Sequence, residues 1–338
     1  MSSSSRIPVT VLTGFLGSGK TTLLNRVLQS PKWSDTAVIV NELGEIALDH
    51  LLIESSSDNV QVLSSGCLCC TLQGDLREML ADLFVRRMNG KVPPFTRVIV
   101  ETSGLADPAP VVNAVVSDPL LRAEYRFSAI VTTVDAMQGP CQMERYSEAR
   151  RQVTLADVLM LTKTDLVTTA DKNGVSEQLR ELNPLAKLAT SVRGDIDPDL
   201  LFPDSARELQ RGVESGLFSG VGGYSALRAA RHTDSVWARS FVIEHPVHWS
   251  GLAAWMAFAV ENFGDRLLRV KGIFTIADER SLVAIHGIGR FFHPPERLGK
   301  QPSHDTVSRL VCIVRNLDEA ELTQSIKLLN KEKATNGF

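Results

Sequence analysis

Residues 9–22 read VTVLTGFLGSGKTT, and this stretch decides the fold expected for the first part of the chain. Five residues that favour β-structure, Val9–Thr13, lead into a glycine-rich turn, and apolar residues follow at helical spacing from Leu23. The turn contains Gly-x4-Gly-Lys-Thr between a predicted strand and a predicted helix, which is the arrangement of a P-loop. We therefore expect a nucleotide-phosphate site near the start of the chain.

Each residue type in this loop has a mechanical reason to bind phosphate. Gly14, Gly17 and Gly19 allow the backbone to curl with its N–H groups pointing inward, and the following helix adds its positive dipole end. Lys20 is expected to reach the β- and γ-phosphates, and the Thr21 hydroxyl to take a position on Mg²⁺. The predicted phosphate-binding set is Gly14, Phe15, Leu16, Gly17, Ser18, Gly19, Lys20, Thr21 and Thr22. A dinucleotide-binding Rossmann loop does not fit, because Thr22 stands at its third glycine position.

Length and composition limit the possible classes of protein. The 338 residues are enough for two domains with sizeable cores, and 43% hydrophobic with 22% charged residues is ordinary for a soluble globular protein. A net charge of −3 gives no reason to expect binding to nucleic acid or to a membrane. The polar segment Met1–Ser5 does not resemble a signal peptide. We therefore expect a cytoplasmic protein, in which the cysteines do not form a disulfide framework.

Predicted strands alternate with predicted helices through the first part of the chain. The strands after the first are expected at residues 37–40, 60–63, 97–100, 128–134, 158–161 and 187–189, and one helix is expected around residues 144–155. This alternation predicts an α/β fold of the P-loop NTPase type, with a doubly wound, mostly parallel sheet covered by helices on both faces. The sequence motifs follow predicted strands, so they should meet at the carboxyl edge of the sheet, where such folds bind ligands.

The rest of the chain predicts a connector and a second, smaller α+β domain. We expect the P-loop domain to cover residues 1–195, a Gly/Ser-rich connector residues 196–235, and the second domain residues 236–338. Its elements are expected as a strand to Glu244, a helix over 249–263, three strands at 267–276, 281–287 and 307–314, and a last helix. That helix should begin at Asp318, with Glu321 completing a capping box.

The segment Glu101-Thr-Ser-Gly104 follows the predicted strand 97–100. In P-loop NTPases an acidic residue at this place holds Mg²⁺ or its water, and a following glycine N–H can sense the γ-phosphate. Glu101 and Gly104 are therefore predicted to be catalytic residues, together with Lys20 and Thr21. The alternative is that Glu101 is simply an acidic residue ahead of a helix that starts near Pro108.

The segment Thr162-Lys-Thr-Asp165 follows another predicted buried strand and is the second nucleotide signal. In Asn-Lys-x-Asp motifs the carboxylate accepts hydrogen bonds from N1 and N2 of guanine, which adenine cannot donate, and the lysine stem packs on the ring. Lys163 and Asp165 are therefore predicted to bind the base of GTP or GDP. Thr162 replaces the usual asparagine, so its amide contribution is lost. An ordinary exposed loop is the alternative.

Cys67-Leu-Cys69-Cys70 places three thiols within four residues. Thiolates suit a soft or borderline ion such as Zn²⁺ or Co²⁺. Because the spacing is too tight for three sulfurs to bind one ion tetrahedrally without strain, we expect two thiolates plus a carboxylate from Glu42 or Glu45. A site with fewer than four strong protein ligands can release its metal. Buried free thiols and a redox pair are the alternatives.

Five motifs occur in the order GFLGSGKTT, NELGE, GCLCC, ETSGLADP and LTKTDL, and RVKGIFTIADE, HGIGRFFHPPERL and SRLVCIVR follow beyond residue 236. With these motifs the chain resembles, over nearly its whole length, the CobW/YjiA-type metal-chaperone GTPases of the CobW/HypB/UreG group. The resemblance implies a GTPase that binds zinc or cobalt and delivers it to a client metalloprotein or a metal-cofactor pathway. It also implies that the GTP or GDP state switches the metal affinity.

The resemblance implies roles for the motif residues by position. Residues 14–22 carry the phosphate role, Glu101 the Walker B-like role with Mg²⁺, and Lys163 and Asp165 the base role. The metal role falls on Cys67, Cys69 and Cys70, with Glu42 and Glu45 as further ligands or as a nucleotide-responsive loop. The protein is expected to be a monomer or a homo-oligomer that depends on nucleotide or metal. A P-loop kinase or ligase acting on a small molecule, and a nucleotide-binding scaffold without metal transfer, are the competing functions.

Overall fold

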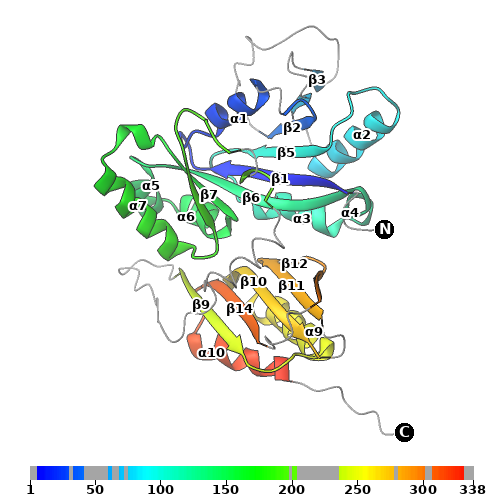
Figure 1. Cartoon of the computed structure of the whole chain (residues 1–338), viewed down its shortest axis with the longest axis vertical. Helices are drawn as coiled ribbons and strands as arrows, with labels where there is room; N and C mark the ends of the chain where they lie inside the picture. The colour runs from blue at the N-terminus through cyan, green and yellow to red at the C-terminus, as the bar shows by residue number, and fades with distance from the viewer. Residues whose placement is uncertain are drawn as a thin grey trace. The chain divides into compact units, whose positions relative to one another are not determined.

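The elements of the computed structural model form two compact units (Figure 1). The first unit contains an eight-stranded sheet and the second a six-stranded sheet. The structure describes residues 6–29, 33–41, 60–62, 68–71, 75–197, 200–203, 236–277, 281–300 and 307–330. Most of residues 196–235 lie outside the described residues, so the domain limits at 195 and 236 stay a prediction. Among the described helices, none is both long and apolar enough to cross a membrane.

The sheet of the first unit has the strand order β3-β4-β2-β5-β1-β6-β7-β8. Its strands are β1 (Ile7–Gly14), β2 (Thr36–Asn41), β3 (Val60–Val62), β4 (Leu68–Thr71), β5 (Arg97–Thr102), β6 (Tyr125–Asp135), β7 (Val158–Thr162) and β8 (Lys187–Ser191). Only β3 runs antiparallel to its neighbour among these described strands. The predicted mostly parallel sheet is therefore confirmed.

Both faces of this sheet are covered. The five consecutive residues Val9–Thr13 of β1 are each 0% exposed, and successive side chains of a strand point to opposite faces. The described helices of the unit are α1 (Lys20–Gln29), α2 (Leu76–Met88), α3 (Ala109–Ser117), α4 (Pro119–Glu124), α5 (Gly139–Arg145), α6 (Ser147–Leu155) and α7 (Thr169–Leu182). Helix α1 buries Leu23, Leu24, Val27 and Leu28, the stripe that the helical spacing predicts.

Two local predictions differ from the structure. A single helix is expected around residues 144–155, but Tyr146 has an extended backbone and separates α5 from α6. The ring of Tyr146 stacks on Phe15 with centroids 4.8 Å apart, so the break coincides with a contact to the P-loop. Residues 68–71, expected to be part of a loop that follows a strand, form strand β4 beside β2.

The second unit is a smaller α+β layer, as the pattern predicts. Its elements are β9 (Val236–Ile243), α9 (Trp249–Phe258), a π-helical turn (Ala259–Phe263), β10 (Leu267–Ile276), β11 (Ser281–Ile288), β12 (Phe291–Phe292), β13 (Glu296–Lys300), β14 (Ser308–Arg315) and α10 (Glu319–Ser325). Trp255 and Leu322 from the helices are fully buried in one core with Val270 and Phe274 of β10. Asp318 caps α10 by accepting from Ala320 N, while Glu321 pairs with Arg266 at 3.0 Å.

Candidate nucleotide and metal site

The P-loop lies at the carboxyl end of β1, between Gly14 and the first turn of α1. Gly14, Gly17 and Gly19 have φ values of 144°, 73° and 97°, a region that favours glycine. A Cβ at Gly14 would lie 2.2 Å from Thr133 Oγ1 and 2.5 Å from the Thr133 carbonyl oxygen. The glycine is therefore a steric requirement, because β6 passes directly behind the loop.

The predicted phosphate residues surround this turn. Lys20, the first residue of α1, is 6% exposed, and its Nζ donates to the carbonyl oxygens of Gly14 at 2.9 Å and Phe15 at 3.4 Å. Thr21 and Thr22 are exposed in the first turn of α1, whereas Ser18 is buried. The Ser18 hydroxyl lies 2.7 Å from Thr133 Oγ1. The buried side of the loop is thus held by side chains of neighbouring strands.

Thr162 has a clear structural task at the position where asparagine was expected. Its Oγ1 lies 2.7 Å from the Ser18 carbonyl oxygen and 3.1 Å from that of Val134, and a hydroxyl can donate to either. Thr162 therefore connects the end of β7 to the P-loop and to β6. The segment 162–165 therefore makes a hydrogen bond to the P-loop through the Thr162 hydroxyl, although it lacks the asparagine amide of Asn-Lys-x-Asp motifs.

Lys163 joins the base motif to the P-loop. Its backbone is left-handed at φ 54°, and its Nζ donates to the Gly17 carbonyl oxygen at 2.8 Å and pairs with Asp135 Oδ2 at 2.7 Å. Asp165 lies two residues further on, exposed in the short turn Thr164–Leu166. The structure therefore brings Lys163 to the phosphate loop and leaves Asp165 accessible beside it.

Asp135 is a site residue that the sequence reasoning missed. Its carboxylate also accepts hydrogen bonds from the backbone N–H groups of Met137 at 2.7 Å and Gln138 at 3.0 Å. Burial works to raise the pKa of Asp135, but the hydrogen bonds from Lys163 and these two N–H groups outweigh it and hold the pKa below its usual range. The signal that could have found it is an acidic residue directly after a buried strand, as for Glu101.

Glu101 and Gly104 lie on the other side of β1. Glu101 is fully buried in β5, and its backbone is in register with Leu12 of β1 and Val40 of β2. A Cβ at Gly104 would lie 2.6 Å from Leu16 Cδ2 and 2.9 Å from Leu16 N. The loop after β5 therefore packs directly against the P-loop.

Only part of the predicted metal motif falls within the described residues. Cys69 and Cys70 belong to β4, where their backbones pair with Val38 and Ile39 of β2, so they do not follow a strand as expected. Glu42, Glu45 and Cys67 lie outside the described residues. Strand β2 separates β4 from β5, which puts the two cysteine backbones roughly 10 Å across the sheet from that of Glu101. Within the described side chains, no group of three His, Cys, Asp or Glu residues could hold a metal.

Comparison with protein families matches both units. Residues 8–190 match the family described as CobW/HypB/UreG, nucleotide-binding domain, and residues 236–329 match the cobalamin synthesis protein cobW C-terminal domain. The zinc chaperone YjiA of Escherichia coli is 33% identical over 331 residues, which covers 96% of this chain and 99% of that protein. The zinc chaperone CobW of Pseudomonas aeruginosa is 28% identical over 363 residues, covering 97% and 92%.

Solved structures agree with these relatives. The Zn(II)-bound YjiA GTPase from E. coli matches with a TM-score of 0.75 and 28% identity, over 96% of this chain and 99% of that one. A Zn(II)-bound variant of that protein, in which a glutamate and two cysteines are replaced by alanine, matches with a TM-score of 0.76 and 27% identity over the same shares. Each of these solved chains therefore matches both the P-loop unit and the second unit of this protein.

Proposed function

The chain belongs to the CobW/HypB/UreG family of nucleotide-binding proteins, and we propose that it is a cytoplasmic, GTP-hydrolysing metallochaperone whose cargo is zinc. Its client would be a metalloprotein that receives the ion. The observation that carries the proposal is the convergence of Lys20, Glu101 and Lys163 on one edge of the sheet. In that sheet one strand, β2, separates Glu101 from the strand that contains Cys69 and Cys70. The names of the zinc chaperone relatives support the choice of cargo.

The P-loop fits a nucleotide phosphate in shape and charge. Gly14 leaves no room for a side chain, and the buried ammonium of Lys20 already contacts two carbonyl oxygens of the loop. In the complex, β- and γ-phosphate oxygens would replace these carbonyls as hydrogen-bond acceptors for Lys20. The N-terminus of α1 adds backbone N–H groups that favour an anion.

Thr21 and Glu101 are the residues that would hold Mg²⁺. Thr21 follows Lys20 at the start of α1, and Glu101 is a buried carboxylate on the strand next to β1. Mg²⁺ held by these residues would supply positive charge to offset that of the nucleotide phosphates. Gly104 packs on Leu16, so the loop after β5 would present its backbone N–H groups where the charge of the γ-phosphate develops during attack by water.

Lys163 and Asp165 would select guanine. The bonds from Lys163 to Gly17 and Asp135 hold its side chain beside the P-loop, so its aliphatic stem is available to the base. Asp165 is exposed next to it and would accept hydrogen bonds from N1 and N2 of the ring. Because Thr162 supplies no amide, we expect the preference for guanine to rest on Asp165.

Zinc would be bound by two thiolates of the cysteine motif and a carboxylate from Glu42 or Glu45. Strand β2 pairs with β4 on one side and with β5 on the other, which supports coupling between the cysteine strand and Glu101. Hydrolysis of GTP to GDP and phosphate would change the order of the surrounding loops and loosen the zinc for transfer.

The test has a nucleotide part and a metal part. We expect GTP to be hydrolysed slowly and ATP far more slowly, and Lys20→Ala to abolish turnover. Zinc should bind at one high-affinity site that is lost in Cys69→Ala with Cys70→Ala and kept in the control Cys141→Ala. Zinc also binds the E. coli variant that lacks two cysteines, so chelator competition must separate the tight site from weaker ones. Phosphorylation of a small-molecule acceptor from ATP would instead identify a kinase, and binding of GTP without turnover a scaffold.

A further inference from the structure

Gln152 of α6 lies beneath the loop that follows β5. The residue is 1% exposed, and its Nε2 donates to the carbonyl oxygens of Gly104 at 3.1 Å and Ala106 at 3.0 Å. Two acceptors on one side of the amide require its NH₂ group, and not its oxygen, to face the loop. A single buried side chain from another element therefore fixes two carbonyls of the Glu101–Gly104 motif and its continuation.

The preceding residue of α6 holds the same loop at a third point. Arg151 Nε pairs with Asp107 Oδ2 at 2.5 Å, in a pair whose side chains are 21% and 36% exposed. The other carboxylate oxygen of Asp107 accepts from Ala109 N at the start of α3. The loop is thus tied to α6 at Gly104, Ala106 and Asp107, just before the chain enters α3.

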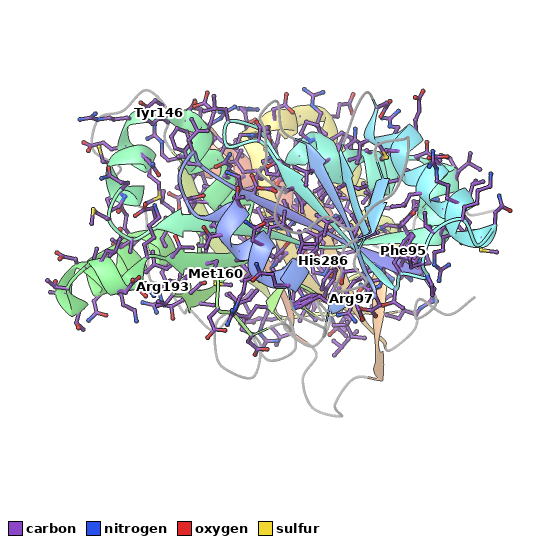
Figure 2. The ribbon with its side chains drawn as sticks, turned by 90° about the horizontal axis from the view of Figure 1, so that it is seen from above. Phe95, Arg97, Tyr146, Met160, Arg193 and His286 are labelled. Atoms are coloured by element: carbon purple, nitrogen blue, oxygen red, sulfur yellow. The ribbon has the colours of Figure 1, made fainter. Side chains whose placement is uncertain are left out.

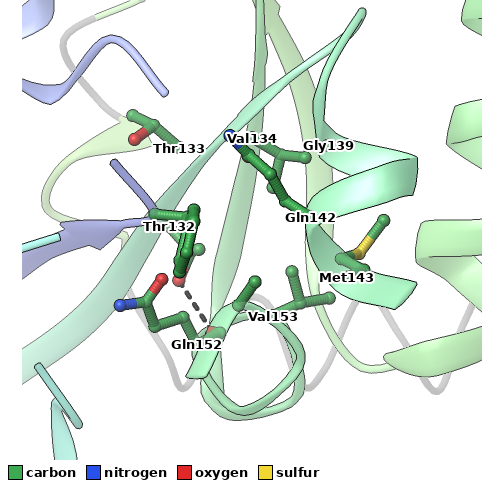
Figure 3. Close-up of a pocket in the computed structure, with 10 residues that line it drawn as sticks. Thr132, Thr133, Val134, Gly139, Gln142, Met143, Gln152 and Val153 are labelled. Carbon is green, nitrogen blue, oxygen red and sulfur yellow. Dashed lines mark hydrogen bonds between the residues drawn. The ribbon is translucent and has the colours of Figure 1, made fainter. Parts of the chain in front are cut away.

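The α5–α6 pair also contacts the tip of the P-loop. Gln142 Nε2 of α5 donates to the Leu16 carbonyl oxygen at 3.2 Å, and Tyr146 stacks on Phe15. Gln142 and Gln152 line the same small cavity, whose volume is about 10 Å³. Figure 3 shows these two residues and the bond that the Thr132 hydroxyl donates to the backbone oxygen of Gln152. The two helices α5 and α6 therefore contact both the P-loop and the loop that follows β5.

We infer that Gln152 is a positioning residue for GTP hydrolysis. Its bonds to the Gly104 and Ala106 carbonyl oxygens keep Gly104 against Leu16, so that the backbone N–H groups of this loop are ready for the γ-phosphate. Arg151 supports the same loop through Asp107. This inference rests on the proposed GTPase function and attributes part of the rate of GTP hydrolysis to a residue of α6. Because GDP has no γ-phosphate, its affinity should not depend on Gln152.

The test compares Gln152→Glu, Gln152→Ala and Arg151→Met with the control Gln178→Glu on α7. Single-turnover GTP hydrolysis, the affinities for GDP and for a non-hydrolysable GTP analogue, and thermal unfolding are measured for each variant. Gln152→Glu keeps the side-chain shape, but an ionised carboxylate would face two carbonyl oxygens without a donor. We expect hydrolysis to fall about 10- to 100-fold, the analogue to bind more weakly and GDP to bind within about twofold of wild type.

A pH profile separates positioning from packing. When protonated, the introduced carboxyl group can donate one O–H to the loop, so the activity of Gln152→Glu relative to wild type should rise as the pH falls. Arg151→Met should show a smaller loss of hydrolysis, again without loss of GDP affinity.

Equal weakening of GDP and the GTP analogue, with no pH dependence, would overturn the inference and leave Gln152 as a packing residue. Wild-type rates in every variant would also overturn it, while the proposed function stands. If wild type itself does not hydrolyse GTP, the proposed function fails. The comparison of analogue with GDP binding then still decides whether Gln152 positions the loop.

Discussion

A side chain at Gly14 would collide with β6, so this position tests the phosphate loop most simply. In Gly14→Ala the new Cβ would meet both Oγ1 and the carbonyl oxygen of Thr133 at under 3 Å. We expect the free energy of unfolding to fall by about 1–3 kcal/mol and nucleotide binding to be lost. Chemical denaturation and GDP titration measure the two effects.

The matched control is Gly174→Ala on α7, where the new Cβ would have no described heavy atom within 4 Å apart from its chain neighbours and the backbone of its own helix. Alanine is the better helix former, so this variant should be neutral or more stable by about 0.5–1 kcal/mol. Nucleotide binding by Gly14→Ala equal to that of the control would contradict the proposed cradle.

The ion pair between Asp135 and Lys163 predicts a dependence of stability on pH. The pKa of Asp135 is lowered from 3.8 in the folded protein, so its contribution is present above that value and is lost as the pH falls through the folded pKa. Asp135→Asn should therefore lower stability at neutral pH and make the loss in acid less steep. Denaturation curves at neutral and acid pH measure this, and parallel curves for both proteins would contradict it.

Single residues of the site were predictable where they follow a strand in the sequence. Lys20, Glu101, Lys163 and Asp165 were predicted in this way, and their roles stay a prediction. The roles of Thr162 and Gln152 were not, because they act through hydrogen bonds across 144 and 48 positions of sequence. Such contacts depend on how strands and helices are placed in space, and no local pattern encodes them.

Among the elements, the segment 200–203 shows how the end of the first unit is anchored. The Leu201 carbonyl oxygen accepts from Thr10 Oγ1 of β1 at 2.5 Å. The Arg97 guanidinium lies 5.5 Å from the Trp33 ring and 5.6 Å from the Phe202 ring, and it pairs with Asp35 at 3.0 Å. Arg97 and Tyr146, which stacks on the P-loop, lie on different sides of the unit (Figure 2).

Phe202→Ala should therefore affect stability and not nucleotide binding. Loss of its ring contacts with Trp33 and Arg97 is expected to lower the free energy of unfolding by about 1–3 kcal/mol. Leu120→Ala on α4 is the control, because Leu120 is 79% exposed and its truncation should stay within about 0.5 kcal/mol. Denaturation with and without GDP measures both, and a large loss of GDP affinity would place this segment in the nucleotide site.

The predicted elements were right where a run of β-favouring or apolar residues marks a buried strand, as in β1, β5 and β7. The break at Tyr146 and strand β4 were missed for a physical reason. Tyr146 is extended where its ring stacks on Phe15, and β4 pairs with β2, whose residues lie about 30 positions earlier. In both cases a contact distant in sequence overrides the local preference.

In the chain as a whole, the strand order explains why separate motifs serve one site. Strands β5, β1, β6, β7 and β8 are neighbours, so their carboxyl ends bring Glu101, the P-loop, Asp135 and Lys163 together. The cysteine strand β4 continues the same sheet through β2. In the proposed switch, a structural change at Glu101 would therefore have to pass through only one intervening strand, β2, to affect Cys69 and Cys70.

The central claim is that zinc binding and nucleotide binding are coupled. Zinc titration in defined nucleotide states tests this coupling most directly. Chelator-competition titrations would be made with nucleotide-free, GDP-bound and GTP-analogue-bound protein, with the Cys69→Ala variant beside them. We predict that zinc affinity differs by at least about fivefold between the GDP and GTP-analogue states, and that zinc changes the ratio of the two nucleotide affinities by the same factor. The difference should disappear in Cys69→Ala. Equal zinc affinity in all nucleotide states would contradict the account of this protein as a nucleotide-switched zinc chaperone.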